Sequence, residues 1–237
     1  MSVQVKLEKI LASYVILIMF SIGGVSTSSA EGQITTNNPV WYSPDLNLMF
    51  EIEGTSSKAV RTHKGFSVQF RTKELNAGDA YTLLVAIFNY PEECTGGANF
   101  PWPEGLEPKP ACSALDLQKP AVAGDIIHLT GNVVGQSGRA AFASYLEIGD
   151  TSNSILAPLN LPVPGLLNPQ GAEYHFVLTS HGPKLPQFMP DMIQTYLGGC
   201  SNQPFPGLPN LPIAAWGKRG PNECVFQQEA FHVAPAQ

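Results

Sequence analysis

The chain has 237 residues, of which 43% are hydrophobic and 14% charged, enough for one large or two small domains with an apolar core. It carries 13 Lys and Arg against 19 Asp and Glu, a net charge of −6, and neither sign is clustered. Because nucleic acids and anionic membrane surfaces attract clustered Lys and Arg, this composition disfavours both as partners.

The first thirty residues have the three regions of a secretory signal peptide. Lys6 and Lys9 form a basic start, residues 11–22 form an apolar stretch, and small residues lead up to Ala30. We expect cleavage after Ala30. The alternative is an uncleaved membrane anchor, but the apolar region 10–25 is shorter than the roughly 20 residues that a bilayer requires.

Two early segments alternate between apolar and polar residues, a pattern typical of half-buried strands. They cover residues 46–52 and 66–72, whereas residues 33–44 are predicted as an extended lead-in and residues 58–65 as a polar connection. The side chains expected to face the core are Leu46, Leu48, Phe50 and Ile52 in the first segment and Phe66, Val68 and Phe70 in the second.

The segment from Asn76 to Cys94 is predicted to contain the central strand. A turn signal over residues 76–79 is followed by an unbroken apolar run from Leu83 to Phe88. Since no polar residue interrupts this run, it suits a strand that is covered on both faces.

Later segments complete an all-β pattern. Residues 125–134 and 139–148 flank a glycine-containing turn and are predicted as a hairpin. Residues 171–181 and 224–233 have strand composition, and residues 190–197 form the one plausible helix. About seven strands joined by Pro/Gly-rich loops indicate a single β-sandwich or jelly roll over residues 31–237.

All four cysteines, Cys94, Cys112, Cys200 and Cys224, follow the expected cleavage point. In an exported protein an even number predicts disulfides. We favour the pairs Cys94–Cys112 and Cys200–Cys224, because each then brackets a Pro/Gly-rich segment. A Cys/His metal site is the alternative, although no C-x2-C or H-x3-H spacing occurs.

Three aromatic residues in loops are candidate ligand contacts. Phe100 and Trp102 lie in the loop between the first two cysteines, and Trp216 lies near the end of a later proline-rich loop. Phe100 and Trp102 are predicted either to pack onto the sandwich or to form an exposed aromatic platform.

His175 and His181 are the candidate catalytic or metal-binding residues. On one strand they would face the same side about 20 Å apart, too far to share a metal unless the chain turns between them. His128 and His232, on other strands, are further histidines that the fold would have to bring together. Ser180 and His181, with Glu173 or Asp191, have the composition of a catalytic triad, but no nucleophile-elbow motif is present.

Three runs resemble a set of uncharacterised exported microbial proteins. They are D-A-Y-T-L-L-V-A-I-F-N-Y-P-E-E-C from Asp79, the G-x-V-x-G-x-x-G-R-A-x-F run from Gly131, and G-A-E-x-H-F-V-L-T-S-H-G-P from Gly171. The resemblance implies export and a shared β domain, and it implies no catalytic residue. The second run is also similar to hairpins of copper/zinc superoxide-dismutase-like sandwiches, but their H-x-H metal ligands are missing, so dismutase activity is not implied.

Two classes of function follow. The first is a secreted or periplasmic binding or structural β domain that needs no cofactor and contacts a protein or glycan of the envelope or exterior. After signal cleavage it would have no membrane contact. The second is a metal-dependent or hydrolytic exported enzyme that uses His175 and His181. We favour the binding domain, because no motif specifies a chemistry.

Overall fold

The computed structural model describes residues 32–45, 48–205 and 207–235, and the side chains of all of these except residues 44, 45 and 48. The predicted signal peptide and the Leu46 position lie outside these ranges. Among the described residues, no helix is long and apolar enough to cross a membrane.

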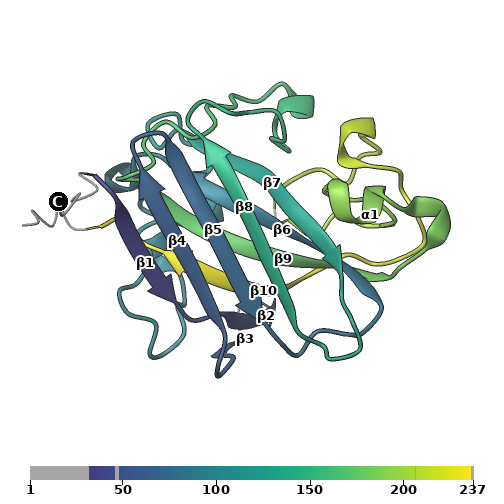
Figure 1. Ribbon diagram of the computed structural model, residues 1–237. Coiled ribbons are helices and arrows are strands. Elements are labelled where there is room, and N and C mark those ends of the chain that lie inside the picture. The colour runs from purple at the N-terminus through teal and green to yellow at the C-terminus, as the bar shows by residue number, and fades with distance from the viewer. Residues whose placement is uncertain (1–31, 46–47, 206, 236–237) are drawn as a thin grey trace, which may run out of the picture. The chain divides into compact units, whose positions relative to one another are not determined.

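In the described part of the chain, ten strands form two antiparallel sheets (Figure 1). The four-stranded sheet has the order β1 (Ile34–Asn38), β4 (Ser56–Thr62), β5 (Gly65–Thr72) and β8 (Ala140–Glu147). The six-stranded sheet has the order β3 (Leu48–Glu51), β2 (Trp41–Asp45), β10 (Val225–His232), β9 (Glu173–Pro183), β6 (Asp79–Phe88) and β7 (Gly124–Val133). The prediction of an all-β sandwich is therefore confirmed.

Strand β6, the predicted central strand, lies inside the larger sheet, next to its edge strand β7. It pairs with β9 on one side and β7 on the other, and all ten of its residues are buried. Tyr81, Leu83, Val85 and Ile87 belong to the core between the sheets. Alternate residues from Leu84 to Phe88 belong to a second apolar cluster on the opposite face. Both faces of one strand are thus covered.

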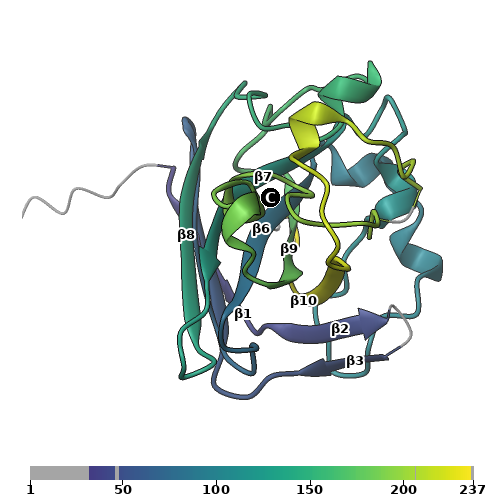
Figure 2. The same cartoon turned by 90° about the vertical axis from the view of Figure 1, so that its right-hand side faces the viewer.

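The cover on the second face is made of loops instead of a third sheet. Figure 2 shows the four-stranded sheet on one side of the six-stranded sheet, and turns and loops on the other side. These loops include helix α1 (Asp191–Gln194), shorter than the predicted 190–197. The remaining helical turns are 3-10 turns at Pro91–Glu93, Gly97–Asn99, Ala114–Asp116, Ala157–Leu159, Pro186–Phe188 and Ala214–Trp216.

The predicted hairpin over residues 125–148 is wrong in its pairing. Both strands exist, but β7 pairs with β6 and β8 pairs with β5, which lies in the other sheet. The turn between them therefore crosses from one sheet to the other. It runs beside the connection from β5 to β6, where the Leu75 N–H donates to the Gly138 carbonyl over 3.1 Å. A short glycine turn fits either path, so the local pattern did not distinguish a hairpin from a crossing.

Three strands are additional to the predicted ones. The lead-in contains β1 and β2, and the polar connection contains β4, whose pairing with β5 spans seven residue pairs. These segments are polar because they lie near sheet edges or face solvent with alternate residues. The predicted inward position of Phe50 is also wrong: it lies on the edge strand β3, is 47% exposed and contacts Tyr42. Ile52, Phe66, Val68 and Phe70 are buried as predicted.

Arg61 ties the two sheets together from inside the core. Its guanidinium group is fully buried, lies 4.2 Å from the centre of the Tyr174 ring, and donates to the carbonyls of Ala172, His232 and Val233. These partners belong to the six-stranded sheet or its flanks, whereas Arg61 belongs to β4. The carbonyls and the aromatic ring stabilise this buried cation without a carboxylate, although its Nε has no hydrogen-bond partner among the described residues.

Replacing Phe176 by Ala tests this core. The ring is fully buried and packs against Phe66 at a centroid distance of 5.8 Å and against His232 at 5.3 Å. The free energy of unfolding, measured by urea titration of the oxidised protein, should fall by about 3–5 kcal/mol. Tyr145→Ala on β8, where the side chain is 54% exposed, should change it by about 0.5 kcal/mol or less. Equal losses in the two variants would contradict the packing described.

Candidate functional site

Two disulfides hold the loops that cover the outer face of the six-stranded sheet, the face directed away from the four-stranded sheet. They join Cys94 to Cys112 and Cys200 to Cys224, as predicted. Such bonds fit an oxidising environment. Each closes a Pro/Gly-rich segment, and in the chain-entropy model a loop of this length contributes about 3 kcal/mol.

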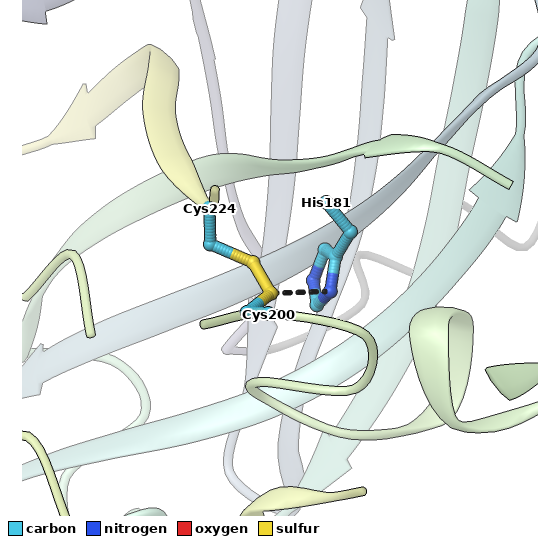
Figure 3. A group of neighbouring side chains, drawn as sticks. All are labelled: His181, Cys200 and Cys224. Atoms are coloured by element: carbon cyan, nitrogen blue, oxygen red, sulfur yellow. Dashed lines mark hydrogen bonds between the residues drawn. A yellow bond between two sulfur atoms is a disulfide. The ribbon is translucent and has the colours of Figure 1, made fainter. Parts of the chain in front are cut away.

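His181 lies against the second disulfide (Figure 3). Its Nδ1 and the two sulfurs all lie within 4.8 Å of one another, so these three residues could form part of a metal site if the sulfurs were thiolates. In the oxidised protein the sulfurs are bonded to each other. The ring nitrogens are also engaged, since Nδ1 donates to the Gly198 carbonyl and Nε2 contacts the Thr82 hydroxyl, each over 2.8 Å. His181 is therefore a structural residue in this state.

His175 forms a pair with Glu173 on the outer face. Both oxygens of Glu173 accept backbone N–H groups, from Ala111 over 2.9 Å and Cys112 over 3.0 Å. His175 Nε2 lies 2.8 Å from Glu173 Oε1. Because that carboxylate accepts hydrogen bonds, Nε2 must be the donor, which leaves Nδ1 as the nitrogen available to a ligand. Glu173 fixes the orientation of the ring.

Glu229 is a second buried acid on the same face. It lies on β10 opposite Val177 of β9 and is 7% exposed. Among the described residues its side chain accepts a single hydrogen bond, a long one of 3.4 Å from the Ser43 hydroxyl. Burial raises the pKa of Glu229 to about 7, against the opposing attraction of the His175 ring. This carboxyl therefore changes charge near neutral pH.

Glu229 and His175 line a cavity of about 60 Å³ with aromatic walls. Its aromatic residues are Phe88, Phe100, Trp102, Phe205, Phe226 and Phe231. Trp102 packs edge-to-face on Phe231 at a centroid distance of 5.2 Å, and its indole N–H donates to the Gly97 carbonyl over 2.8 Å. The loop closed by the first disulfide thus holds the indole over the sheet.

A larger apolar pocket of about 500 Å³ adjoins this cavity. The two share Ala114, Leu117 and Phe205 as lining residues. The other walls of the pocket come from the start of β7 and from two proline-rich loops around residues 156–164 and 205–208. The outer face therefore offers an apolar pocket beside an aromatic cavity that contains an acid.

The structure does not bring the two candidate histidines together. His175 and His181 both lie on β9, which continues without a turn between them, so they are about 20 Å apart at roughly 3.3 Å per residue. Glu173 pairs with His175 and not with His181. His232 is buried between the sheets, where its ring contacts the hydroxyls of Thr36 and Ser57.

The three aromatic candidates have different surroundings. Phe100 and Trp102 are half-buried, pack on each other at 4.2 Å and line the cavity. Trp216 is 1% exposed, belongs to the outer-face core, and donates its indole N–H to the Ile155 carbonyl over 2.8 Å. Its position gives a ligand no access to the ring.

Glu229 did not appear among the sequence candidates. Its neighbours in the sequence have the composition of an ordinary strand. A β-bulge between Phe226 and Gln228 shifts which side chains face the outer side of the sheet, so Phe226 and Glu229 line the same cavity. An acid flanked by aromatic residues in a strand was the only signal. Comparisons of the chain with protein-family models, with curated proteins and with solved structures found no match.

The raised pKa of Glu229 predicts a specific pH dependence. A folded-state pKa of about 7, above the ordinary 4.5, means that the stability due to the protonated form is present below pH 4.5 and is lost as the pH rises through 7. Compared with wild type, Glu229→Gln should therefore gain unfolding free energy between pH 4.5 and 8, on the order of 3 kcal/mol. The measurement is the difference in unfolding free energy between Glu229→Gln and wild type, obtained by urea titration at each pH.

The comparison with wild type is needed because buried histidines act in the opposite sense. Burial lowers the pKa of His128 and His181 to about 4 and that of His232 to about 3, so their contribution is lost as the pH falls below about 6.5. The variant Glu147→Gln, at an exposed position of β8, should parallel wild type. A parallel profile for Glu229→Gln would show that Glu229 titrates normally.

Proposed function

We propose that this protein is an exported binding module that takes up a small apolar molecule on the outer face of its six-stranded sheet. The observation that carries this proposal is the apolar pocket of about 500 Å³ between β7 and the loops. That volume falls within the roughly 300–1,000 Å³ of small-molecule sites, which are lined mainly by hydrophobic side chains.

The walls of the pocket support an uncharged ligand. Its apolar lining includes Leu117, Ile126, Leu156, Leu161, Val163 and Leu208. The one charged lining residue, Lys119, already forms an ion pair with Asp116 over 2.6 Å. No unpaired charge in the lining favours an ionic ligand, whereas burial of apolar surface stabilises an apolar one.

The loops that form the pocket are held before any ligand binds. One wall follows the Cys94–Cys112 disulfide, and Ser113 and Asp116 cap the turn that carries Leu117. A preformed pocket lowers the entropic cost of binding. The two disulfides and the signal-peptide pattern together support a secreted or periplasmic location.

A small molecule fits these features better than the protein or glycan partner expected from exposed aromatic residues. That expectation required three accessible rings, whereas Trp216 is buried in the core and Phe100 and Trp102 face the cavity. The concave site is lined by aliphatic residues and prolines, which suit an apolar molecule instead of the hydroxyl groups of a sugar.

Filling the pocket tests the proposal. The neutral probe N-phenyl-1-naphthylamine should bind the oxidised protein with enhanced fluorescence, because the pocket excludes water. Val163 lines the pocket and is half-buried, so Val163→Trp should occupy the space and weaken binding at least about tenfold, or about 1.4 kcal/mol.

Leu115→Trp provides the matched control. Leu115 is 80% exposed and lies beside the pocket residue Ala114, so the same indole there should leave probe affinity unchanged. Urea midpoints of both variants establish that they fold. Absence of probe binding, or equal affinity for the Val163→Trp variant and wild type, would refute the apolar site.

A further inference from the structure

The aromatic cavity contains an acid, Glu229, that forms no ion pair with a Lys or Arg in the described part of the chain. Glu229 lines the cavity and is only 7% exposed. The single hydrogen bond that its side chain accepts from the described residues is the long contact with Ser43. A buried carboxylate is costly unless a cation or several hydrogen bonds stabilise it, so the site is incomplete when empty.

The walls around this acid have the chemistry that binds organic cations. Phe231 packs edge-to-face on the His175 ring and Phe88 packs tilted against it, each at a centroid distance of 4.9 Å. Trp102 packs edge-to-face on Phe231. The faces of such rings carry partial negative charge and attract a cation within about 6 Å. Trp102 is the ring type that attracts cations most strongly.

The size of the cavity limits the cation. Its volume of about 60 Å³ is roughly four to six times the 10–15 Å³ that one water molecule needs. A trimethylammonium group has four heavy atoms and matches this space. The cavity offers few hydrogen-bond acceptors. A weakly hydrated cation such as trimethylammonium therefore gives up less hydration free energy on entering it than a primary ammonium group does.

We propose that this cavity binds a methylated ammonium group, with Glu229 as its counterion and Trp102, Phe88 and Phe231 as its aromatic walls. This site is distinct from the apolar pocket, although the two share part of a wall. His175 also faces the cavity, and its hydrogen bond to Glu173 keeps its ring in a fixed orientation.

Calorimetric titration at pH 8, where the carboxyl of Glu229 is mostly ionised, provides the test. The probes are choline and its uncharged isostere 3,3-dimethyl-1-butanol, which have nearly the same shape. Choline should bind at least about tenfold more tightly, because only the charged form gains the cation–π and carboxylate attraction.

Variants assign the interaction to residues. Glu229→Gln keeps the shape and removes the charge, so it should weaken choline binding at least about tenfold and leave the isostere unaffected. Trp102→Leu should weaken choline binding to a similar extent by removing the strongest cation–π partner. Glu147→Gln, at an exposed site in the other sheet, should match wild type. Far-UV circular dichroism and urea midpoints establish that each variant folds.

Val163→Trp separates this inference from the proposed function. Val163 lines the apolar pocket and not the aromatic cavity, so this variant should lose the apolar probe and retain choline. No choline binding, equal binding of choline and its isostere, or an unchanged affinity in Glu229→Gln would each overturn the cation site and leave the apolar pocket to its own test.

The methylated ammonium group can be free or part of a lipid headgroup. Sedimentation with phosphatidylcholine vesicles distinguishes these sources. Vesicle binding that choline competes away and that Glu229→Gln abolishes would assign a headgroup, whereas binding of free choline alone would assign a soluble ligand. Vesicle binding that persists in Glu229→Gln, with no binding of free choline, would overturn the proposal.

Discussion

Strand β6 has no polar face, and the architecture follows from the need to cover both of its sides. The four-stranded sheet buries the side chains of one face, among them Leu83 and Val85. The other face carries Leu84 and Phe88, and its cover consists of long loops. Burial of each such side chain contributes about 1.5–3 kcal/mol, so a loop layer held over this face is a large part of the stability of the fold.

Loops rich in proline and glycine have no hydrogen-bonded ladder of their own, so other contacts must hold them. The two disulfides close them at their ends. Inside the layer, Trp216 packs edge-to-face on Tyr196 at 5.5 Å and anchors one loop by its bond to the Ile155 carbonyl. The apolar pocket and the aromatic cavity both lie within this layer.

The same cover explains the electrostatics of the site. Glu173, His175 and Glu229 lie at outward positions of β9 and β10, where a one-layer sheet would expose them to water. Under the loops they are almost completely buried. Glu173 accepts hydrogen bonds from two backbone N–H groups and from His175. Within the described part of the chain, Glu229 accepts one long hydrogen bond, from Ser43, and burial raises its pKa.

Local pattern determined much of this molecule: the doubly buried strand from Ala80 to Phe88, the all-β class, and the pairing of neighbouring cysteines around loops that have no ladder. These features depend on residues close in sequence. Partner choice was decided only in three dimensions: β7 and β8 joined different sheets, the polar segment 56–62 became a strand by pairing with β5, and Glu173 met His175 under a loop. Strand pairing and burial of charge depend on contacts between distant residues, and alternation in one segment carries no information about which surface will cover it.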